Sequence, residues 1–276
     1  MTEKEQTVER IKEMAKAMRL HALHMAFSAG SKGAHLGSGL SMIDLMAVLY
    51  GAILKRDPKN PHWEKRDRFI LSKGHGTLGY YTALAEAGYF SIDELYTFEE
   101  NEGFLPGQPA MNMDKGIEFS SGSLGLGLSL GVGVALNAKK QKRDYSTFVL
   151  MGNGECNEGT VWEAAMSAAH FKLDHLIAII DHNHMQSDGK SSEIMDMGDL
   201  AAKWRCFGWE AAEVDGHDVG AIYNVFSNIP RGGRPFVVIA HTVKGKGISF
   251  MENNNEWHHS YLSKEQYGRA VAEINK

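Results

Sequence analysis

The sequence predicts an α/β protein with a doubly wound, mostly parallel sheet that carries helices on both faces. Short apolar runs rich in β-forming residues recur along the chain, at residues 69–71, 147–150, 176–180 and 236–240. Each run is nearly continuous rather than alternating, which is typical of strands buried on both faces. Helix-like stretches separate the runs, and this order favours a parallel sheet. No repeat or Pro/Ser-rich linker interrupts the chain, so we expect a single domain over residues 1–276.

The helices are predicted from apolar residues that recur at three- and four-residue spacing. The chain opens with a long amphipathic helix whose apolar side includes Val8 and Ile11. A second helix is expected from about Ser41, as N-cap, to Leu54. Further helices are expected at residues 77–87, 124–141, 160–171, 199–207, 217–228 and 266–276.

Composition and charge exclude several classes of function. The formal net charge is −5 and the 29 basic residues are spread along the chain, so a nucleic-acid partner is not expected. The two cysteines, Cys156 and Cys206, form neither a disulfide framework nor a zinc pattern, which fits a reducing compartment. The N-terminus lacks a signal-like apolar stretch, and no apolar run is long enough to span a bilayer. We therefore expect a cytoplasmic protein with no membrane partner.

Polar, glycine-rich segments follow three of the predicted strands. They occupy residues 72–76 (Ser-Lys-Gly-His-Gly), 151–155 (Met-Gly-Asn-Gly-Glu) and 181–185 (Asp-His-Asn-His-Met). Ligands of open parallel sheets bind in the crevice outside the carboxyl ends of the strands. These segments therefore predict a ligand site at that edge of the sheet.

Two of these segments favour a cation held against a phosphate. Glycines such as Gly154 let the backbone turn sharply and approach a ligand closely, and the helix expected from residue 160 would direct its positive end toward an anion. The side-chain carbonyls of Asn153 and Asn183 and the backbone carbonyl of Met185 suit Mg²⁺ or Ca²⁺. The pattern alone leaves a second interpretation open, in which the segments are β-turns that select Asn and Gly for geometry.

The wider set of motifs resembles transketolases. The family's thiamine-diphosphate signature is Gly-Asp-Gly followed about thirty residues later by Asn, and the segment 152–165 is similar to the N-terminal half of a transketolase. Collinear similarity occurs at residues 34–37, 67–76, 121–125, 243–247 and 251–258. Together the motifs extend over roughly residues 10–262, which makes a chance match improbable.

The resemblance implies roles for the matched residues in binding thiamine diphosphate. Asn153, Asn183 and the Met185 carbonyl would hold Mg²⁺ (or Ca²⁺) against the diphosphate, and Asp181 would orient the metal-binding turn. Glu158 would join a carboxylate network between neighbouring cofactor sites. The remaining implied contacts with the cofactor are Gly154, His75, the backbone of Gly122, and Leu124.

The resemblance also implies a substrate site and a reaction. His35 and His258 would hydrogen-bond sugar hydroxyls and help to move protons, with His75 nearby. The implied reaction transfers a two-carbon ketol unit from a ketose to an aldose, where the sugars are phosphates or analogues. The family activates its cofactor with a glutamate from a pyrimidine-binding domain, which would begin after residue 276. We therefore expect a naturally divided enzyme whose C-terminal transketolase subunit is a separate chain, in an α₂β₂ assembly.

Several residues depart from the family pattern. Asn153 replaces the metal-binding Asp and loses one negative charge, so we expect weaker retention of metal and cofactor. Gln108 replaces an active-site His and can bind a hydroxyl but cannot shuttle a proton. The family pattern also has different residues at three further positions, which are Leu126, Ser187 and Leu36 in this chain. The departures favour an enzyme tuned to an unusual sugar, sulfonated or branched.

The alternatives are a catalytically weakened regulatory paralogue that binds the cofactor, or the α subunit of another thiamine-diphosphate enzyme, such as a 2-oxo-acid dehydrogenase complex. Deoxyxylulose-phosphate synthesis is a closer alternative, but that enzyme should come as one long chain. The Ser-Lys-Gly-His and Lys-Gly-Lys-Gly segments, residues 72–75 and 244–247, do not support the dehydrogenase alternative. The histidines without a matching family role are expected to be solvated or structural: His170, His175, His182 and His184.

Overall fold

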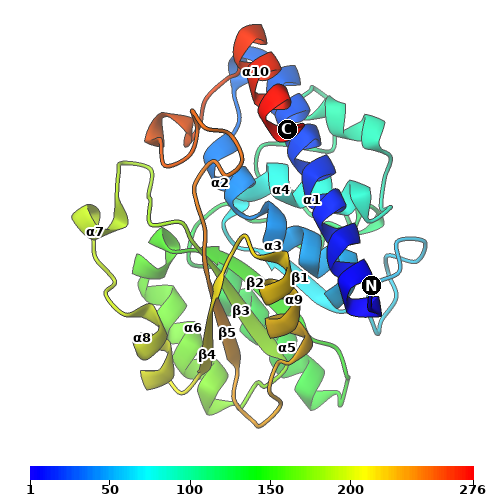
Figure 1. The fold of residues 1–276 in the computed structure, drawn as a ribbon. Coiled ribbons are helices and arrows are strands. Elements are labelled where there is room, and N and C mark those ends of the chain that lie inside the picture. Colours follow the sequence, from blue (N-terminus) through cyan, green and yellow to red (C-terminus); the bar gives the residue numbers. More distant parts are fainter.

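The centre of the molecule is a parallel sheet, seen here in a computed structural model that describes residues 1–276 (Figure 1). The sheet has five strands in the order β1-β2-β3-β5-β4, and every neighbouring pair is parallel. The predicted fold class is therefore confirmed. The strands are β1 (Arg68–Leu71), β2 (Thr147–Gly152), β3 (Leu176–His182), β4 (Glu210–Asp215) and β5 (Phe236–His241).

Helices cover both faces of the sheet, because alternate strand residues belong to two separate apolar cores. On β3, Ile177 and Ile179 pack into a core shared with α1, α3, α4 and α9, whereas Ala178 and Ile180 pack into one shared with α5, α6 and α8. This alternation is the two-residue period of a strand. The helices are α1 (Glu3–Ser28), α2 (Leu36–Ser41), α3 (Ile43–Val48), α4 (Thr77–Glu86), α5 (Gly127–Lys140), α6 (Gly159–His170), α7 (Ser191–Ile194), α8 (Leu200–Cys206), α9 (Val219–Ser227) and α10 (Lys264–Ile274).

Two expectations about the elements are wrong. The second helix does not begin at Ser41, because α2 and α3 meet there and α3 continues into a π-helical turn, η2 (Leu49–Ile53). Ser41 is itself the last helical residue of α2, and the N-cap position of α3 is Met42; the buried Ser41 hydroxyl donates to Asp181. Strand β4 is not among the predicted strands. It is an edge strand in which only Val214 is buried, so it lacks a continuous apolar run.

Segments from the two ends of the chain lie side by side. Helix α1 begins at a capping box formed by Thr2 and Glu5, and it lies beside α10 near the other end of the chain (Figure 1). A short antiparallel bridge joins Ala34 to Ser260. No helix combines the length and the apolar character that a bilayer crossing requires.

A candidate active-site cavity at the carboxyl edge

A cavity of about 360 Å³ opens where the strands of the sheet end. Its walls come from the segments that follow β1, β2, β3 and β5, together with residues 35–38, 108, 122–124 and 258. The segments after β2 and β3 lie side by side, because Gly152 pairs with Asp181 in the sheet and the amide of Asn153 donates to the Asp181 carbonyl at 3.2 Å. The predicted convergence of these two strand ends is confirmed.

Almost all of the predicted site residues line this one cavity. They are His35, His75, Gln108, Gly122, Leu124, Asn153, Gly154, Glu158, Asn183, Met185 and His258. The exception is Asp181, which is fully buried below the cavity rather than in its wall. The structure thus brings together residues that lie more than 200 positions apart in the chain.

Asp181 forms a buried network beneath the cavity. Its carboxylate accepts from the hydroxyls of Ser41 and Thr242 and pairs with the ammonium of Lys73, which is also buried. Burial alone would raise the pKa of Asp181, but Lys73 and the hydroxyl donors outweigh it, so the pKa is lowered. Because the side chain of Asn183 donates to Asp181 at 3.3 Å, the network also fixes one of the predicted metal ligands.

The predicted cation ligands present oxygen atoms to the cavity. The amide nitrogen of Asn153 donates to the Ser191 hydroxyl at 2.5 Å, and that of Asn183 donates to Asp181. Both nitrogens are therefore engaged by protein acceptors, which leaves the carbonyl oxygens as the atoms available to a ligand. The Asn183 oxygen also accepts from the amide of Met185 at 3.1 Å. Two amide oxygens and a main-chain carbonyl form a donor set that fits a hard cation.

Close packing limits side-chain size at two glycines of this region. The backbone turns directly after β2, where the amide of Cys156 donates to the Asn153 carbonyl at 3.1 Å, although neither Gly152 nor Gly154 has a positive φ. A Cβ on Gly154 would lie 2.9 Å from the Gln186 side chain. Likewise, a Cβ on Gly74 would lie 2.3 Å from the amide oxygen of Gln108. These glycines let neighbouring walls of the cavity touch.

Three histidines, His35, His75 and His258, face one another across the cavity and are called the cavity histidines below. Their ring centroids lie 5.5 Å apart in each pair. Burial, together with the positive charge of Lys73 and Lys244 and the neighbouring imidazoles, lowers the pKa to about 4 for His35, about 2 for His75 and about 4 for His258. All three rings are therefore neutral at pH 7, so each can both donate and accept a hydrogen bond.

Lys244 fixes the tautomer of one cavity histidine. Its ammonium is 3.0 Å from Nδ1 of His258, and it also donates to the Asn255 side chain at 2.6 Å and to the Gln186 carbonyl at 2.9 Å. An ammonium only donates, so Nδ1 of His258 accepts and its proton resides on Nε2. Burial, with a smaller contribution from Lys73, lowers the pKa of Lys244 to about 8, which leaves it charged at pH 7. The sequence matched this lysine to a motif but did not predict its role.

Glu155 is a second residue whose role the sequence did not predict. Its buried carboxylate accepts from the amides of Gly125 at 2.8 Å and Gly152 at 3.1 Å, and from the Ser72 hydroxyl. Burial raises its pKa, although these donors oppose the rise. Glu155 thereby joins the segment after β2 to the segments that carry Gly122 and His75. The sequence feature that could have identified Glu155 is its position directly after Gly-Asn-Gly.

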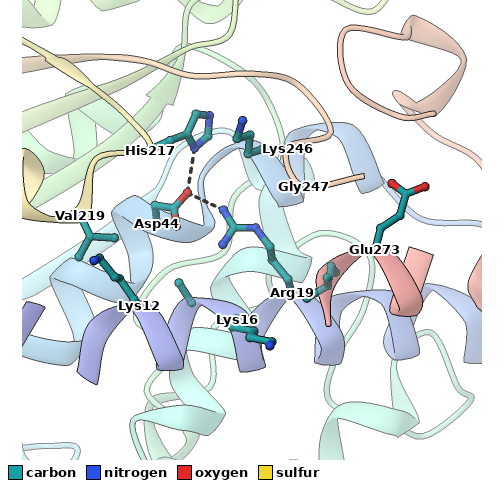
Figure 2. A pocket seen from close by; sticks show the side chains of 11 residues that line it. Lys12, Lys16, Arg19, Asp44, His217, Val219, Lys246, Gly247 and Glu273 are labelled. Carbon is teal, nitrogen blue, oxygen red and sulfur yellow. Dashed lines mark hydrogen bonds and ion pairs between the residues drawn. The ribbon is translucent and has the colours of Figure 1, made fainter. Parts of the chain in front are cut away.

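A separate cavity of about 440 Å³ lies beside α1 and α10 (Figure 2). Within it Asp44 accepts from Arg19 at 2.5 Å and from Nδ1 of His217 at 2.8 Å, while Nε2 of His217 accepts from the amide of Val243 at 2.8 Å. Because Nε2 accepts, neutral His217 carries its proton on Nδ1. These contacts tie α1, α3 and the segment after β4 together, although Nε of Arg19 is buried without a hydrogen-bond partner. None of the predicted site residues lines this cavity, so it is not the candidate cofactor site.

Comparisons with known proteins agree with the geometry. The family model described as "Transketolase, thiamine diphosphate binding domain" matches residues 11–273. The chain is 40% identical to one of the subunits of the apulose-4-phosphate transketolase of Actinobacillus succinogenes, over 96% of this chain and 95% of that protein. It is 42% identical to the 6-deoxy-6-sulfo-D-fructose transketolase subunit SqwG of Clostridium sp. (strain MSTE9), over 88% of each.

Solved structures show the same fold. The transketolase from Leishmania mexicana superposes with a TM-score of 0.89 at 28% identity, over 96% of this chain and 41% of that one. The transketolase from Campylobacter jejuni gives a TM-score of 0.88. The chain therefore spans about two fifths of the length of these solved enzymes.

Proposed function

This chain belongs to the transketolase family through its thiamine-diphosphate-binding domain, and from that premise we propose that it is the cofactor-binding subunit of a two-chain transketolase. The reaction is the transfer of a two-carbon ketol unit from a ketose to an aldose. The observation that carries this proposal is the convergence of the strand-end segments, with their oxygen donors and cavity histidines, on one cavity. A weakened regulatory paralogue is not favoured, because the cavity retains three histidines, His35, His75 and His258, together with two lysines.

The donor set supports a divalent cation and a diphosphate in this cavity. The side-chain oxygens of Asn153 and Asn183 and the carbonyl of Met185 would hold Mg²⁺, which prefers oxygen ligands and shares phosphate oxygens. Thiamine diphosphate supplies, when bound, the stabilisation of carbanion character that ketol transfer requires. Gly154, His75, the Gly122 backbone and Leu124 are the proposed contacts with the cofactor.

The cavity histidines would bind and orient the sugar. His258 donates from Nε2, because Lys244 occupies its Nδ1. His35 is neutral and can accept a hydrogen bond from one hydroxyl while it donates to another. Gln108 lines the same cavity and would bind a hydroxyl without exchanging a proton.

The substrate class that we propose is a ketose with a branched chain or a sulfonate group, or the phosphate of such a sugar. Two relatives of high identity are named for such sugars, apulose 4-phosphate and 6-deoxy-6-sulfo-D-fructose. The departures from the general pattern, Gln108 among them, agree with an altered substrate. Coupled assays of the two-chain enzyme with these donors and a common aldose acceptor would separate the candidates.

The proposed partner is a C-terminal transketolase subunit that carries the pyrimidine-binding domain, in a cytoplasmic α₂β₂ assembly. The relatives named as subunits of transketolases support a second chain. Leu124 lines the cavity and, like Leu126 and Leu130 shortly after it in the chain, is exposed, so these residues offer apolar surface to such a chain. Light scattering after size exclusion would test the assembly, and ketol transfer by this chain alone would contradict it.

The sharpest test of the cofactor site is Asn153→Asp. The added negative charge at a cation ligand should tighten the binding of thiamine diphosphate with Mg²⁺ at least about tenfold, or about 1.4 kcal/mol. Calorimetric titration of the chain with its partner measures the dissociation constant. Asn228→Asp adds the same charge at an exposed position and should leave it unchanged. An equal constant for Asn153→Asp and wild type would show that Asn153 is not a metal ligand.

A further inference from the structure

Three histidines cluster on the opposite side of the sheet from the candidate active site. His182 and His241 end the neighbouring strands β3 and β5 and pair directly in register, and His184 follows two residues after His182. On β3 the even-numbered Ala178 and Ile180 point into the core under α5, α6 and α8, so His182 lies on that face. Asp181 points the other way, toward Ser41 and the cavity.

The three imidazoles are close enough to share one ligand. One ring nitrogen from each residue lies within 4.8 Å of the others, and the ring centroids are 4.1 Å apart for His182 and His184 and 5.3 Å apart for His182 and His241. Around a tetrahedral zinc ion, nitrogens lie roughly 3.3 Å from one another. His184 and His241 are exposed, so small side-chain rotations can close the remaining gap.

One buried ring nitrogen of the cluster has no hydrogen-bond partner. Nδ1 of His182 is shielded from solvent and has no hydrogen-bond partner, which is uncommon for a buried polar atom. The only carboxylate bonded to the cluster is that of Glu213, which lies 2.9 Å from Nε2 of His241. A carboxylate that orients a histidine in this way is a regular companion of zinc sites. The backbone of His184 has a φ of 61°, a left-handed conformation, and its ring lies against that of His182.

We propose that His182, His184 and His241 form a Zn²⁺ site that is separate from the oxygen-lined cation site of the cavity. Imidazole nitrogens suit zinc, whereas Mg²⁺ requires oxygen ligands. The protein supplies three ligands, and water completes the tetrahedron. The two sites share one stretch of backbone, since Asn183 and Met185 alternate with the zinc ligands. Zinc would therefore anchor the segment that carries the proposed magnesium ligands.

The test is a zinc titration of tag-free protein, stripped of metal and then supplied with excess Mg²⁺ and thiamine diphosphate. Wild type should bind one Zn²⁺ per chain, and Co²⁺ in its place should show the intense visible bands of tetrahedral coordination. His184→Asn removes the imidazole but keeps a residue that accepts a positive φ. It should weaken Zn²⁺ at least about tenfold, and Glu213→Gln should weaken it about 10- to 100-fold.

The control is His170→Ala, which removes a histidine outside the cluster and should leave zinc affinity unchanged. Melting curves without metal would show that each variant is folded. The proposal is overturned when wild type binds no stoichiometric zinc, or when His184→Asn binds zinc as tightly as wild type. Neither result depends on transketolase activity. Asn153→Ala alters the proposed magnesium site, so zinc binding that persists in this variant would show that the zinc site is distinct from the cavity.

Discussion

Replacing Lys73 with methionine should leave the carboxylate of Asp181 buried without its counter-ion. Both side chains are almost fully buried, and the pair lies below the candidate active-site cavity. At a charge separation of roughly 3 Å and an effective dielectric constant of about 20, their attraction is about 5 kcal/mol. Two hydroxyl donors remain on Asp181 after the change. We therefore expect Lys73→Met to reduce the free energy of unfolding by about 3–5 kcal/mol at pH 7.

The pH dependence of this loss identifies its cause. In wild type the pKa of Asp181 is lowered, so its stabilising contribution is lost as the pH falls below the ordinary carboxyl range. In Lys73→Met burial is no longer opposed by the ammonium and should raise the same pKa. The difference between variant and wild type should then shrink from pH 7 to pH 5, as the buried carboxyl takes up a proton.

Urea unfolding followed by tryptophan fluorescence measures both quantities. The double variant Lys73→Met/Asp181→Asn holds no buried charge at this position, so it should be more stable than Lys73→Met alone. Lys190→Met is a matched control, because its pairing with Glu193 is solvent-exposed, and it should change stability by less than about 0.5 kcal/mol. A loss below about 1 kcal/mol for Lys73→Met, or a double variant as unstable as the single one, would refute the reasoning.

Three further predictions follow from buried groups. The cavity histidines have lowered pKa values, so between about pH 4 and pH 6.5 the unfolded chain binds more protons than the folded chain. The free energy of unfolding of the cofactor-free protein should therefore be highest above about pH 6.5 and fall toward pH 4. A urea midpoint that is constant over this range would contradict the prediction. Iodoacetamide should modify exposed Cys206 in the native protein, whereas Cys156, whose pKa is raised by burial, should react only after unfolding; mass spectrometry distinguishes the two. His217→Phe removes the bonds to Asp44 and Val243 and should reduce stability by about 2–3 kcal/mol, and an unchanged urea midpoint would show that this contact is dispensable.

The sequence predicted the buried strands well because burial on both faces leaves a continuous apolar run. It did not predict β4, since an edge strand buries one side chain, Val214, and its remaining residues are polar or small. The predicted start of the second helix was also wrong. Ser41 has the residue type of an N-cap, but it lies inside α2, with its hydroxyl directed to the distant Asp181. In both cases the deciding interaction is formed with residues distant in the sequence.

The sequence predicted those candidate-site residues that lie in polar motifs directly after a strand. Asn153 and Asn183 were found from such motifs, and the structure brings them to one cavity. Glu155 and Lys244 were missed as site residues because their importance lies in their partners, the amides of distant glycines and the ring of His258. The sequence also gives no sign that His182, at the end of β3, and His184, two residues later, belong to a cluster. Their proximity to a histidine at the end of β5 depends on the β3–β5 pairing, which no local pattern reveals.

The bridge between Ala34 and Ser260 has a consequence for the timing of biosynthesis. One rim of the cavity is made by a segment synthesised early in translation, and the opposing rim by one synthesised more than 200 residues later. His258 cannot reach its position beside His35 until the whole intervening polypeptide has left the ribosome. A nascent chain that stops short of this point has an open cavity wall, so the complete set of cofactor and sugar contacts forms only afterwards.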